Sequence, residues 1–285
     1  MADLNRKTIV VTGAGSGIGQ GLALKSAARG ARVAVVDIMT DGASATVERI
    51  ATAGGDARAY QADVTDLETL QAVSERIEAD FGRINMVFNN AGVFTAGPIK
   101  RTRPQGFAWV FDVNVRCLYN AITAFLPALE RTAAAGDLAH IVNTGSEYSV
   151  AVPTMGPFTA YTATKHAVLG ITDGLRRDLK GSGIDVSVNC PGLVQTGLWN
   201  AKRTRQDRFG GSREAPPEAA VAMAEGKDRG RDGRYGLRRA GRGRVHDHHG
   251  PAHRRLHPTP SRRHRPCARY RRRTCDVALI AGGII

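Results

Sequence analysis

The chain has 285 residues, of which 42% are hydrophobic and 23% are charged, so it is long enough for one α/β domain with a sizeable core. Its formal net charge is +14, yet residues 1–200 hold 18 Lys and Arg against 18 Asp and Glu, whereas 201–285 hold 22 against 8. The basic excess therefore lies wholly in residues 201–285. The charge of residues 1–200 is balanced and gives no indication of an anionic partner.

Short runs rich in β-branched residues alternate with longer segments of helical character over the first 190 residues. Two of these runs, "VAVV" and "MVF", lack in/out alternation, as expected for strands that are buried on both faces. This alternation predicts an α/β fold with a doubly wound parallel sheet in three α/β/α layers. The expected strands are residues 8–12, 32–37, 86–89, 141–144 and 185–189. The pattern fades from about Lys202 and is absent beyond Glu225.

A glycine-rich turn follows the first expected strand in "TIVVTGAGSGIGQG". Gly13, Gly17 and Gly19 leave no Cβ atoms in the way of a pyrophosphate, and the N–H groups of a helix N-terminus would face the anion. The strict G-x-G-x-x-G spacing fails, because Ile18 stands where its third glycine would fall. The cluster alone is also compatible with an ordinary turn.

An acidic residue ends the second expected strand. Asp37 lies 18 residues after Gly19, close to the spacing at which a carboxylate meets the adenosine ribose of a dinucleotide. That carboxylate would accept hydrogen bonds from ribose hydroxyls and repel a 2′-phosphate, which favours NAD over NADP. The alternative is that Asp37 is only a turn residue at a strand end.

Six motifs occur in order along the chain: "TGAGSGIG" (12–19), "NNAG" (89–92), "DVNV" (112–115), "IVNTGS" (141–146), "YTATK" (161–165) and "CPGLVQT" (190–196). Together they resemble the short-chain dehydrogenase/reductase family over roughly residues 5–200. The resemblance implies a Rossmann-like fold and the NAD(P)-dependent interconversion of a small alcohol and a ketone or aldehyde. It also implies a homodimer or homotetramer.

The resemblance assigns acid/base chemistry to Tyr161 and Lys165, which are four residues apart and so share one helix face. A free phenol titrates near pH ~10, and a neighbouring ammonium would lower that pKa toward neutral pH. In the family the lysine also binds the nicotinamide ribose. The alternative for "YTATK" is an ordinary helix start with a surface lysine.

Two polar residues would support this pair by resemblance. Ser146 would hold the carbonyl or developing alkoxide oxygen, and Asn114 matches the asparagine that helps position the lysine through water. The alternatives are a helix or turn cap for Ser146 and a satisfied polar residue within a helix for Asn114.

The remaining cofactor contacts are carried over onto matching positions. Asp63 and Val64 would meet adenine, Asn90 would lie beside the ribose, and the 190–196 turn would contact the nicotinamide carboxamide. Asp63 could instead cap the helix that opens near Leu67. The full predicted cofactor set is Gly13, Ser16, Gly17, Ile18, Gly19, Asp37, Asp63, Val64, Asn90, Tyr161, Lys165, Pro191, Gly192, Val194 and Thr196, with no metal ligand.

The loop between Ser146 and Tyr161 departs from the family pattern. The two residues are 15 apart, two more than is commonest in the family, and the added loop is a candidate for substrate contacts. Tyr148, Met155 and Phe158 are therefore candidate pocket residues, with simple loop packing as the alternative. Glu147, directly after the serine, is bulkier and more acidic than the resemblance leads us to expect.

The C-terminal part raises a separate question. We divide the chain into an NAD-binding and catalytic domain (1–200), a substrate lid (201–225) and a basic, largely disordered tail (226–285). Five histidines lie within "VHDHHGPAHRRLH" (245–257). A metal site there lacks a scaffold, and a nucleic-acid arm lacks aromatic interleaving.

A third hypothesis is that the tail comes from a shifted reading frame. Arg, Gly, Pro, His and Ala dominate it, and "VHDHH" read one nucleotide later gives a strand-like sequence such as Phe-Met-Ile-Thr-Thr. A displaced frame would reduce stability and activity, because an edge of the sheet and part of the lid would lose their partners. Resequencing codons 222–245 tests the hypothesis.

The sequence thus predicts an NAD-dependent alcohol dehydrogenase or carbonyl reductase. The rivals are an NADP-dependent reductase of the same fold and a non-catalytic protein that binds nucleic acid through its basic arm. Four cysteines without a CxxC pair and no secretory apolar segment after Met1 predict a reduced, cytoplasmic setting. The apolar residues 277–285 are far shorter than the ~20 residues that span a bilayer, which argues against a membrane protein.

Overall fold

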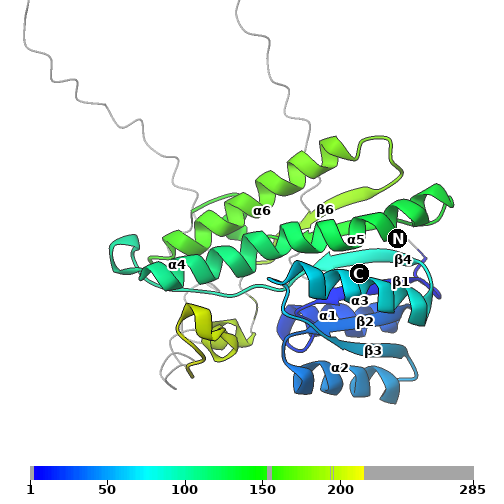
Figure 1. Cartoon of the computed structure of the whole chain (residues 1–285), viewed down its shortest axis with the longest axis horizontal. Helices are drawn as coiled ribbons and strands as arrows, with labels where there is room; N and C mark the ends of the chain where they lie inside the picture. The colour runs from blue at the N-terminus through cyan, green and yellow to red at the C-terminus, as the bar shows by residue number, and fades with distance from the viewer. Residues whose placement is uncertain (1–2, 153–155, 193, 195, 215–285) are drawn as a thin grey trace, which may run out of the picture.

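The computed structural model describes residues 3–152, 156–192, 194 and 196–214. Within these residues, six parallel strands form one sheet in the order β3-β2-β1-β4-β5-β6 (Figure 1). The strands are β1 (Thr8–Thr12), β2 (Arg32–Asp37), β3 (Asp56–Gln61), β4 (Ile84–Asn89), β5 (His140–Thr144) and β6 (Asp185–Asn189). The predicted Rossmann-like α/β fold is confirmed.

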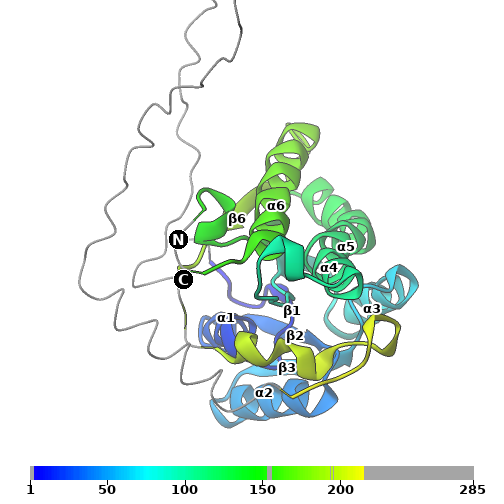
Figure 2. The same cartoon turned by 90° about the vertical axis from the view of Figure 1, so that its left-hand side faces the viewer.

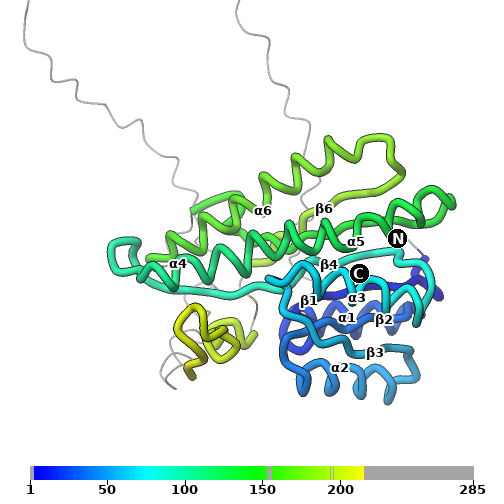
Figure 3. The backbone as a smooth tube through the Cα atoms, in the orientation of Figure 1, coloured from blue at the N-terminus to red at the C-terminus, as the bar shows by residue number. Residues whose placement is uncertain are grey.

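Helices cover both faces of this sheet. They are α1 (Gly17–Ala27), α2 (Thr40–Thr52), α3 (Leu67–Phe81), α4 (Pro104–Phe111), α5 (Cys117–Ala134) and α6 (Thr159–Asp178). Leu22 of α1 and Ile50 of α2 pack in one apolar cluster with the strands, whereas Ile77 of α3 and Phe125 of α5 belong to another. The tube view shows α1 and α2 near β2 and β3, and α5 and α6 extending together past β4 and β6 (Figure 3).

The five strands expected from the sequence are all present, but β3 was missed. Its sequence, DARAYQ, is mostly exposed, and only Tyr60 is buried. β3 pairs with β2 alone, at an edge of the sheet. An edge strand of this kind needs no continuous apolar run, so it carries little of the signal that marks the buried strands.

The strand order places a crevice at one end of the sheet. β1 and β4 are neighbours. The chain continues from β1 to β2 on one side and from β4 to β5 on the other, so a ligand crevice forms outside the carboxyl ends of these strands. The segment after β6 returns to this end: η4 (Gly197–Thr204) and η5 (Asp207–Phe209) lie across β2 and β3 toward α3 (Figure 2). The predictions made for residues 226–285 and for Met155 lie outside the described residues.

Candidate active site

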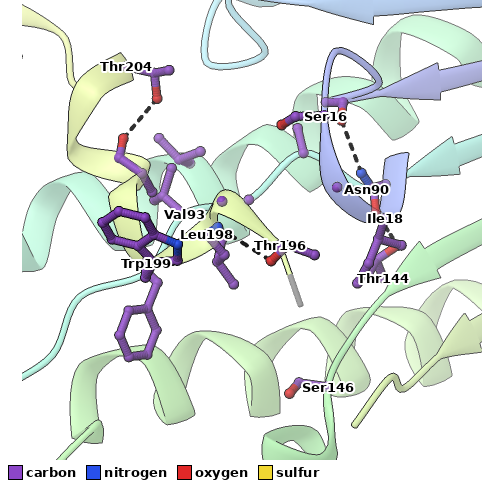
Figure 4. A pocket seen from close by; sticks show the side chains of 18 of the residues that line it. Ser16, Ile18, Asn90, Val93, Thr144, Ser146, Thr196, Leu198, Trp199 and Thr204 are labelled. Atoms are coloured by element: carbon purple, nitrogen blue, oxygen red, sulfur yellow. Dashed lines mark hydrogen bonds between the residues drawn. The ribbon is translucent and has the colours of Figure 1, made fainter. Parts of the chain in front are cut away.

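A cleft of about 680 Å³ opens at the carboxyl ends of the strands, and it is lined by every predicted site residue except Gly19 and Asn114. The carboxyl ends of all six strands contribute, and the residues that represent them are Gly13 after β1, Asp37 at the end of β2, Asp63 after β3, Asn90 after β4, Ser146 after β5 and Pro191 after β6. Figure 4 shows Ser16, Ile18 and Asn90 on one side, Leu198 and Trp199 on another, and Ser146 apart from both. Residues distant in sequence thus surround one elongated space.

The glycine turn approaches the loop after β4 too closely for side chains. Gly13 has φ +64°, and a Cβ there would lie 2.8 Å from Ala91 Cα. A Cβ on Gly19 would lie 2.1 Å from the carbonyl oxygen of Gly13, so Gly19 permits tight packing rather than lining the cleft. Ser16 stands at the N-cap of α1 without a side-chain capping bond, which leaves the first turn of the helix available to an anion.

Asp37 is held by two backbone amides at the far end of the cleft. Its Oδ2 accepts from Gly15 N–H at 2.8 Å and its Oδ1 accepts from Met39 N–H at 2.9 Å. A carboxylate has about four acceptor positions, so it retains lone pairs for ribose hydroxyls. Asp37 therefore orders the turn and also faces the cleft. The alternative that it is only a turn residue describes part of its environment.

Asp63 does not cap the following helix. α3 is capped by Asp66, whose side chain accepts from Thr69 N–H at 3.2 Å, so that alternative is wrong. Asp63 Oδ1 instead accepts from the Thr65 N–H at 2.9 Å and from its hydroxyl at 2.6 Å, and Oδ2 accepts from Gln206 Nε2 at 3.0 Å. The adenine-side loop is thereby tied to the segment between η4 and η5. Arg208 Nη2 adds a bond to the Thr65 hydroxyl at 2.6 Å.

Asn90, directly after β4, is bonded to the last residue of β1. Its Nδ2 donates to the carbonyl oxygen of Thr12 at 3.0 Å, and its backbone N–H donates to the Thr12 hydroxyl at 3.0 Å. Val64 also lines the cleft, and its carbonyl accepts from Asn120 Nδ2 at 3.2 Å. Asn120 is a supporting residue that the sequence reading missed, because nothing in its helix pattern distinguishes it.

Ser146 and Tyr161 lie at the opposite end from Asp37, and both are buried. Burial raises the pKa of Tyr161 to about 12, a side-chain hydrogen bond with Ser146 lowers it, and Tyr148 and Glu147 raise it further. The prediction that this pKa is brought down toward neutral pH is wrong, because desolvation, the largest effect, raises it. Ser146 also precedes the short helix η3 (Glu147–Ser149), and its N–H donates to the Ser149 hydroxyl at 3.1 Å.

Lys165 is buried, with a side chain enclosed in the protein, so the surface-lysine alternative is wrong. Its Nζ donates to the carbonyl oxygen of Thr144 at 2.9 Å and lies 5.7 Å from the centroid of the Tyr161 ring. Burial lowers the pKa of Lys165 to about 8, against a raising effect of Cys117 and Cys190. α6 thus carries both predicted residues, and the four-residue spacing brings them to the same end of the cleft.

Asn114 lies behind the cleft in a π-helical turn, Asp112–Arg116. Its Oδ1 accepts from Val93 N–H at 2.8 Å, and its Nδ2 donates to Val93 O and to the Thr164 hydroxyl, each at 3.0 Å. It is therefore a satisfied buried residue, as one alternative held. A Cβ on Gly92 would lie 3.3 Å from Asn114 Oδ1 and 3.8 Å from Lys165 Nζ, so Asn114 and the lysine are close neighbours.

Aromatic side chains surround the Tyr161 end. The ring centroid of Phe94 lies 5.1 Å from that of Tyr161 and 4.9 Å from that of Phe158, and the Tyr148 centroid lies 5.7 Å from that of Tyr161. Tyr148 and Phe158 line the cleft, as the loop hypothesis expected, together with Trp109 and Leu198. Phe94 and Trp109 were missed, because they lie in segments that carry no motif.

The loop after β6 forms the remaining wall. The carbonyl oxygen of Pro191 accepts from Glu147 N–H at 3.1 Å, and the Thr196 hydroxyl accepts from Leu198 N–H at 3.3 Å to begin η4. Gly192 and Val194 also line the cleft. Residues 197–214 therefore continue the predicted nicotinamide turn directly into the wall above the aromatic end.

Among the described residues, no group of three or more His, Cys, Asp or Glu side chains is placed to hold a metal ion. Within the same part of the chain, no helix combines the length and apolarity needed to cross a bilayer.

The doubly wound sheet and the glycine turn at its crevice define an α/β protein of the dinucleotide-binding class. Residues 7–207 match the short chain dehydrogenase family. The chain belongs to this family, and the resemblance found in the motifs is confirmed.

Similar proteins include several named dehydrogenases. The 1-deoxy-11-beta-hydroxypentalenate dehydrogenase of Streptomyces avermitilis is 38% identical over 231 residues, which cover 79% of this chain and 83% of that protein. The galactitol 2-dehydrogenase of Agrobacterium fabrum is 32% identical over 221 residues, covering 78% and 83%. A short-chain dehydrogenase/reductase from Burkholderia phymatum, solved in complex with NAD, has a TM-score of 0.71 at 30% identity and covers 80% of both chains.

Proposed function

We propose that this protein is an NAD-dependent oxidoreductase that interconverts a small-molecule alcohol and a ketone or aldehyde. The observation that carries the proposal is the arrangement of one cleft with Asp37 and the glycine turn at one end and the Ser146–Tyr161 pair at the other. The glycine turn excludes side chains where a pyrophosphate would lie, and α1 begins beside it, so the residues present fit a dinucleotide.

A bound nicotinamide dinucleotide supplies or accepts the hydride. Ser146 donates a hydrogen bond to the substrate oxygen and Tyr161 moves the proton. With its pKa raised to about 12, the phenol is protonated at neutral pH and can donate to a carbonyl oxygen. In the oxidation direction Tyr161 accepts the hydroxyl proton, which requires its pKa to fall when the cleft is filled.

Lys165 and Asn114 support the phenol in this proposal. Lys165 places a buried cation 5.7 Å from the ring centroid, where it favours the phenolate once other ligands organise the site. Asn114 fixes the loop at Val93 and reaches Thr164, whose hydroxyl donates to the carbonyl oxygen of Tyr161 at 2.6 Å. It acts as a positioning residue.

Specificity for NAD over NADP is proposed from Asp37, because its carboxylate occupies the position that a 2′-phosphate would approach. The Burkholderia phymatum protein, solved in complex with NAD, supports the same choice. We also propose a cytoplasmic homodimer or homotetramer, which rests on the family resemblance and on the free, buried thiols of Cys117 and Cys190.

The test is turnover of secondary alcohols with NAD and of ketones with NADH, on the native protein and on Tyr161→Phe. We expect the substitution to lower kcat by about 10²–10⁴-fold, the usual contribution of a positioned acid/base, while NADH still binds. Full activity of Tyr161→Phe would contradict the proposal. Tyr60→Phe is a matched control, because it removes a phenol that bonds Asp80 at 2.7 Å, away from the cleft.

A further inference from the structure

Glu147 is the feature of the cleft that the proposed chemistry leaves unused. It follows Ser146 directly, begins η3 and lines the cleft. Its N–H donates to Pro191 O at 3.1 Å, and its own carbonyl oxygen accepts from Ala151 N–H at 3.2 Å. The backbone of Glu147 is therefore fixed between Ser146, which follows β5, and the loop after β6.

The carboxylate of Glu147 lies in an unusual environment for a charge. Oε2 would be 3.9 Å from a Cβ added at Gly192, and the described residues give the carboxylate neither a hydrogen bond nor an ion pair. Partial burial raises the pKa of Glu147, and the negative charge of Glu147 raises the pKa of Tyr161. A partly desolvated carboxylate is unfavourable unless water or a ligand in the cleft supplies a donor, so a ligand that brings one here gains a hydrogen bond.

The cations that share the cleft do not neutralise this carboxylate. Lys165 donates to Thr144 O at 2.9 Å, and Arg203 donates to Gly197 O at 3.2 Å and Asn200 O at 3.4 Å. The walls beside Tyr161 are aromatic. The reaction end of the cleft therefore combines an apolar surface for a flat or cyclic group with one acceptor beside the serine.

We propose that Glu147 is a specificity-determining residue that selects alcohols carrying a second hydrogen-bond donor, a hydroxyl or an ammonium, next to the reacting carbon. This inference rests on the proposed function, since it names the substrate class of the same site. The reaction is unchanged: the reacting carbon loses a hydride to NAD and its hydroxyl loses a proton to Tyr161, while the second donor stays bound to Glu147.

Three probes that differ in one group test the inference: styrene glycol, phenylethanolamine and α-ethylbenzyl alcohol carry a hydroxyl, an ammonium and a methyl group at the same position. We expect the native enzyme to favour styrene glycol, phenylethanolamine or both over α-ethylbenzyl alcohol by roughly 10–100-fold in kcat/KM, the effect of one charge-assisted hydrogen bond. Glu147→Leu should bring both ratios to about one.

Two further variants keep the result interpretable. Glu147→Gln retains an acceptor oxygen, so it should keep part of the preference for the hydroxyl and lose any preference for the ammonium. Glu48→Gln removes an exposed carboxylate of α2 and should leave the ratios as in the native enzyme. Unfolding temperatures of all variants separate loss of fold from loss of selectivity.

Different results overturn different statements. Turnover of all three probes with equal kcat/KM would overturn the role of Glu147 and leave the proposed function standing. If Glu147→Leu raised the KM for NAD and left the kcat/KM ratios between the probes unchanged, the carboxylate would be a contact of the cofactor and not of the substrate. Oxidation of other secondary alcohols without oxidation of any of the three probes would overturn this inference and leave the proposed function standing. Absence of turnover with every secondary alcohol and ketone would contradict both.

Discussion

At the scale of one residue, Asp37 is the proposed determinant of cofactor choice. Its two carboxylate oxygens are held by the Gly15 and Met39 amides, so its charge cannot turn away from the cleft. We expect Asp37→Ser to shift the ratio of kcat/KM for NAD over NADP by on the order of a hundredfold toward NADP, because it removes both ribose acceptors and the repulsion of a phosphate.

Initial rates with NAD and with NADP check this prediction. Asp41→Ser is the control, since Asp41 is an exposed acid in the first turn of α2, near the same end of the cleft. An unchanged ratio in Asp37→Ser, or an equal shift in Asp41→Ser, would contradict the role assigned to Asp37.

Glu147 and Tyr161 form a second pair that acts at the residue scale. The negative charge of Glu147 raises the pKa of Tyr161, since a nearby anion opposes formation of the phenolate. Glu147→Gln removes that charge, so the limb of the pH profile of kcat/KM that reports phenol ionisation should move to lower pH. A profile that stays in place, or moves to higher pH, would show that the carboxylate does not act on the phenol.

The family resemblance of the motifs names the predicted site residues, but it does not give their ionisation. The four-residue interval between Tyr161 and Lys165 places them on one helix face in any helix. The pKa of Tyr161 depends instead on how deeply Phe94 and Tyr148 enclose it, and these residues come from other segments. Sequence reasoning therefore places the two residues on one face of α6 but misjudges the direction of the pKa shift.

At the scale of elements, Thr164 links α6 to the π-helical turn. Its hydroxyl accepts from Asn114 Nδ2 at 3.0 Å and donates to Tyr161 O at 2.6 Å. Thr164→Val would leave an Asn114 donor unpaired in the interior, at a cost of about 1–3 kcal/mol in the free energy of unfolding. We expect kcat to fall as well, because α6 loses a contact that sets the position of Tyr161.

Thr132→Val provides a control with the same chemistry. Thr132 is a buried threonine of α5 whose hydroxyl donates to Ile84 O at 2.8 Å, far from the cleft lining. Urea unfolding should detect a loss of stability in both variants, whereas steady-state kinetics should detect a fall in kcat only for Thr164→Val. Equal kcat in the two variants would mean that α6 is positioned by packing alone.

The elements themselves were predictable to different degrees. Buried strands such as β2 and β4 can be predicted from their apolar runs, and the glycine turn indicates the end of β1 and the start of α1. The exposed edge strand β3 has no such run, and the π-helical turn at Asp112–Arg116 inserts one residue into an otherwise continuous helical pattern. Neither leaves a periodicity that distinguishes it from a loop or an ordinary helix.

At the scale of the whole molecule, a buried residue of the candidate site lowers the free energy of unfolding. Lys165 is enclosed beside Thr144, and burial lowers its pKa to about 8, which means that folding disfavours its charged form. We expect Lys165→Met to raise the free energy of unfolding at pH 7 by about 1 kcal/mol, since it removes a buried charge at the loss of one hydrogen bond, while turnover is lost.

The pH dependence fixes the sign of this effect. Between the folded pKa of about 8 and the ordinary value of 10.5, the unfolded chain binds more protons at Lys165 than the native protein, so native stability rises with pH there. The advantage of Lys165→Met in urea unfolding should therefore shrink as pH rises above 8, whereas Lys25→Met, which changes an exposed lysine of α1, should change little at any pH. A Lys165→Met protein less stable than the native one at pH 7 would show that the ammonium is a net stabilising group, because its bond to Thr144 would then outweigh its desolvation.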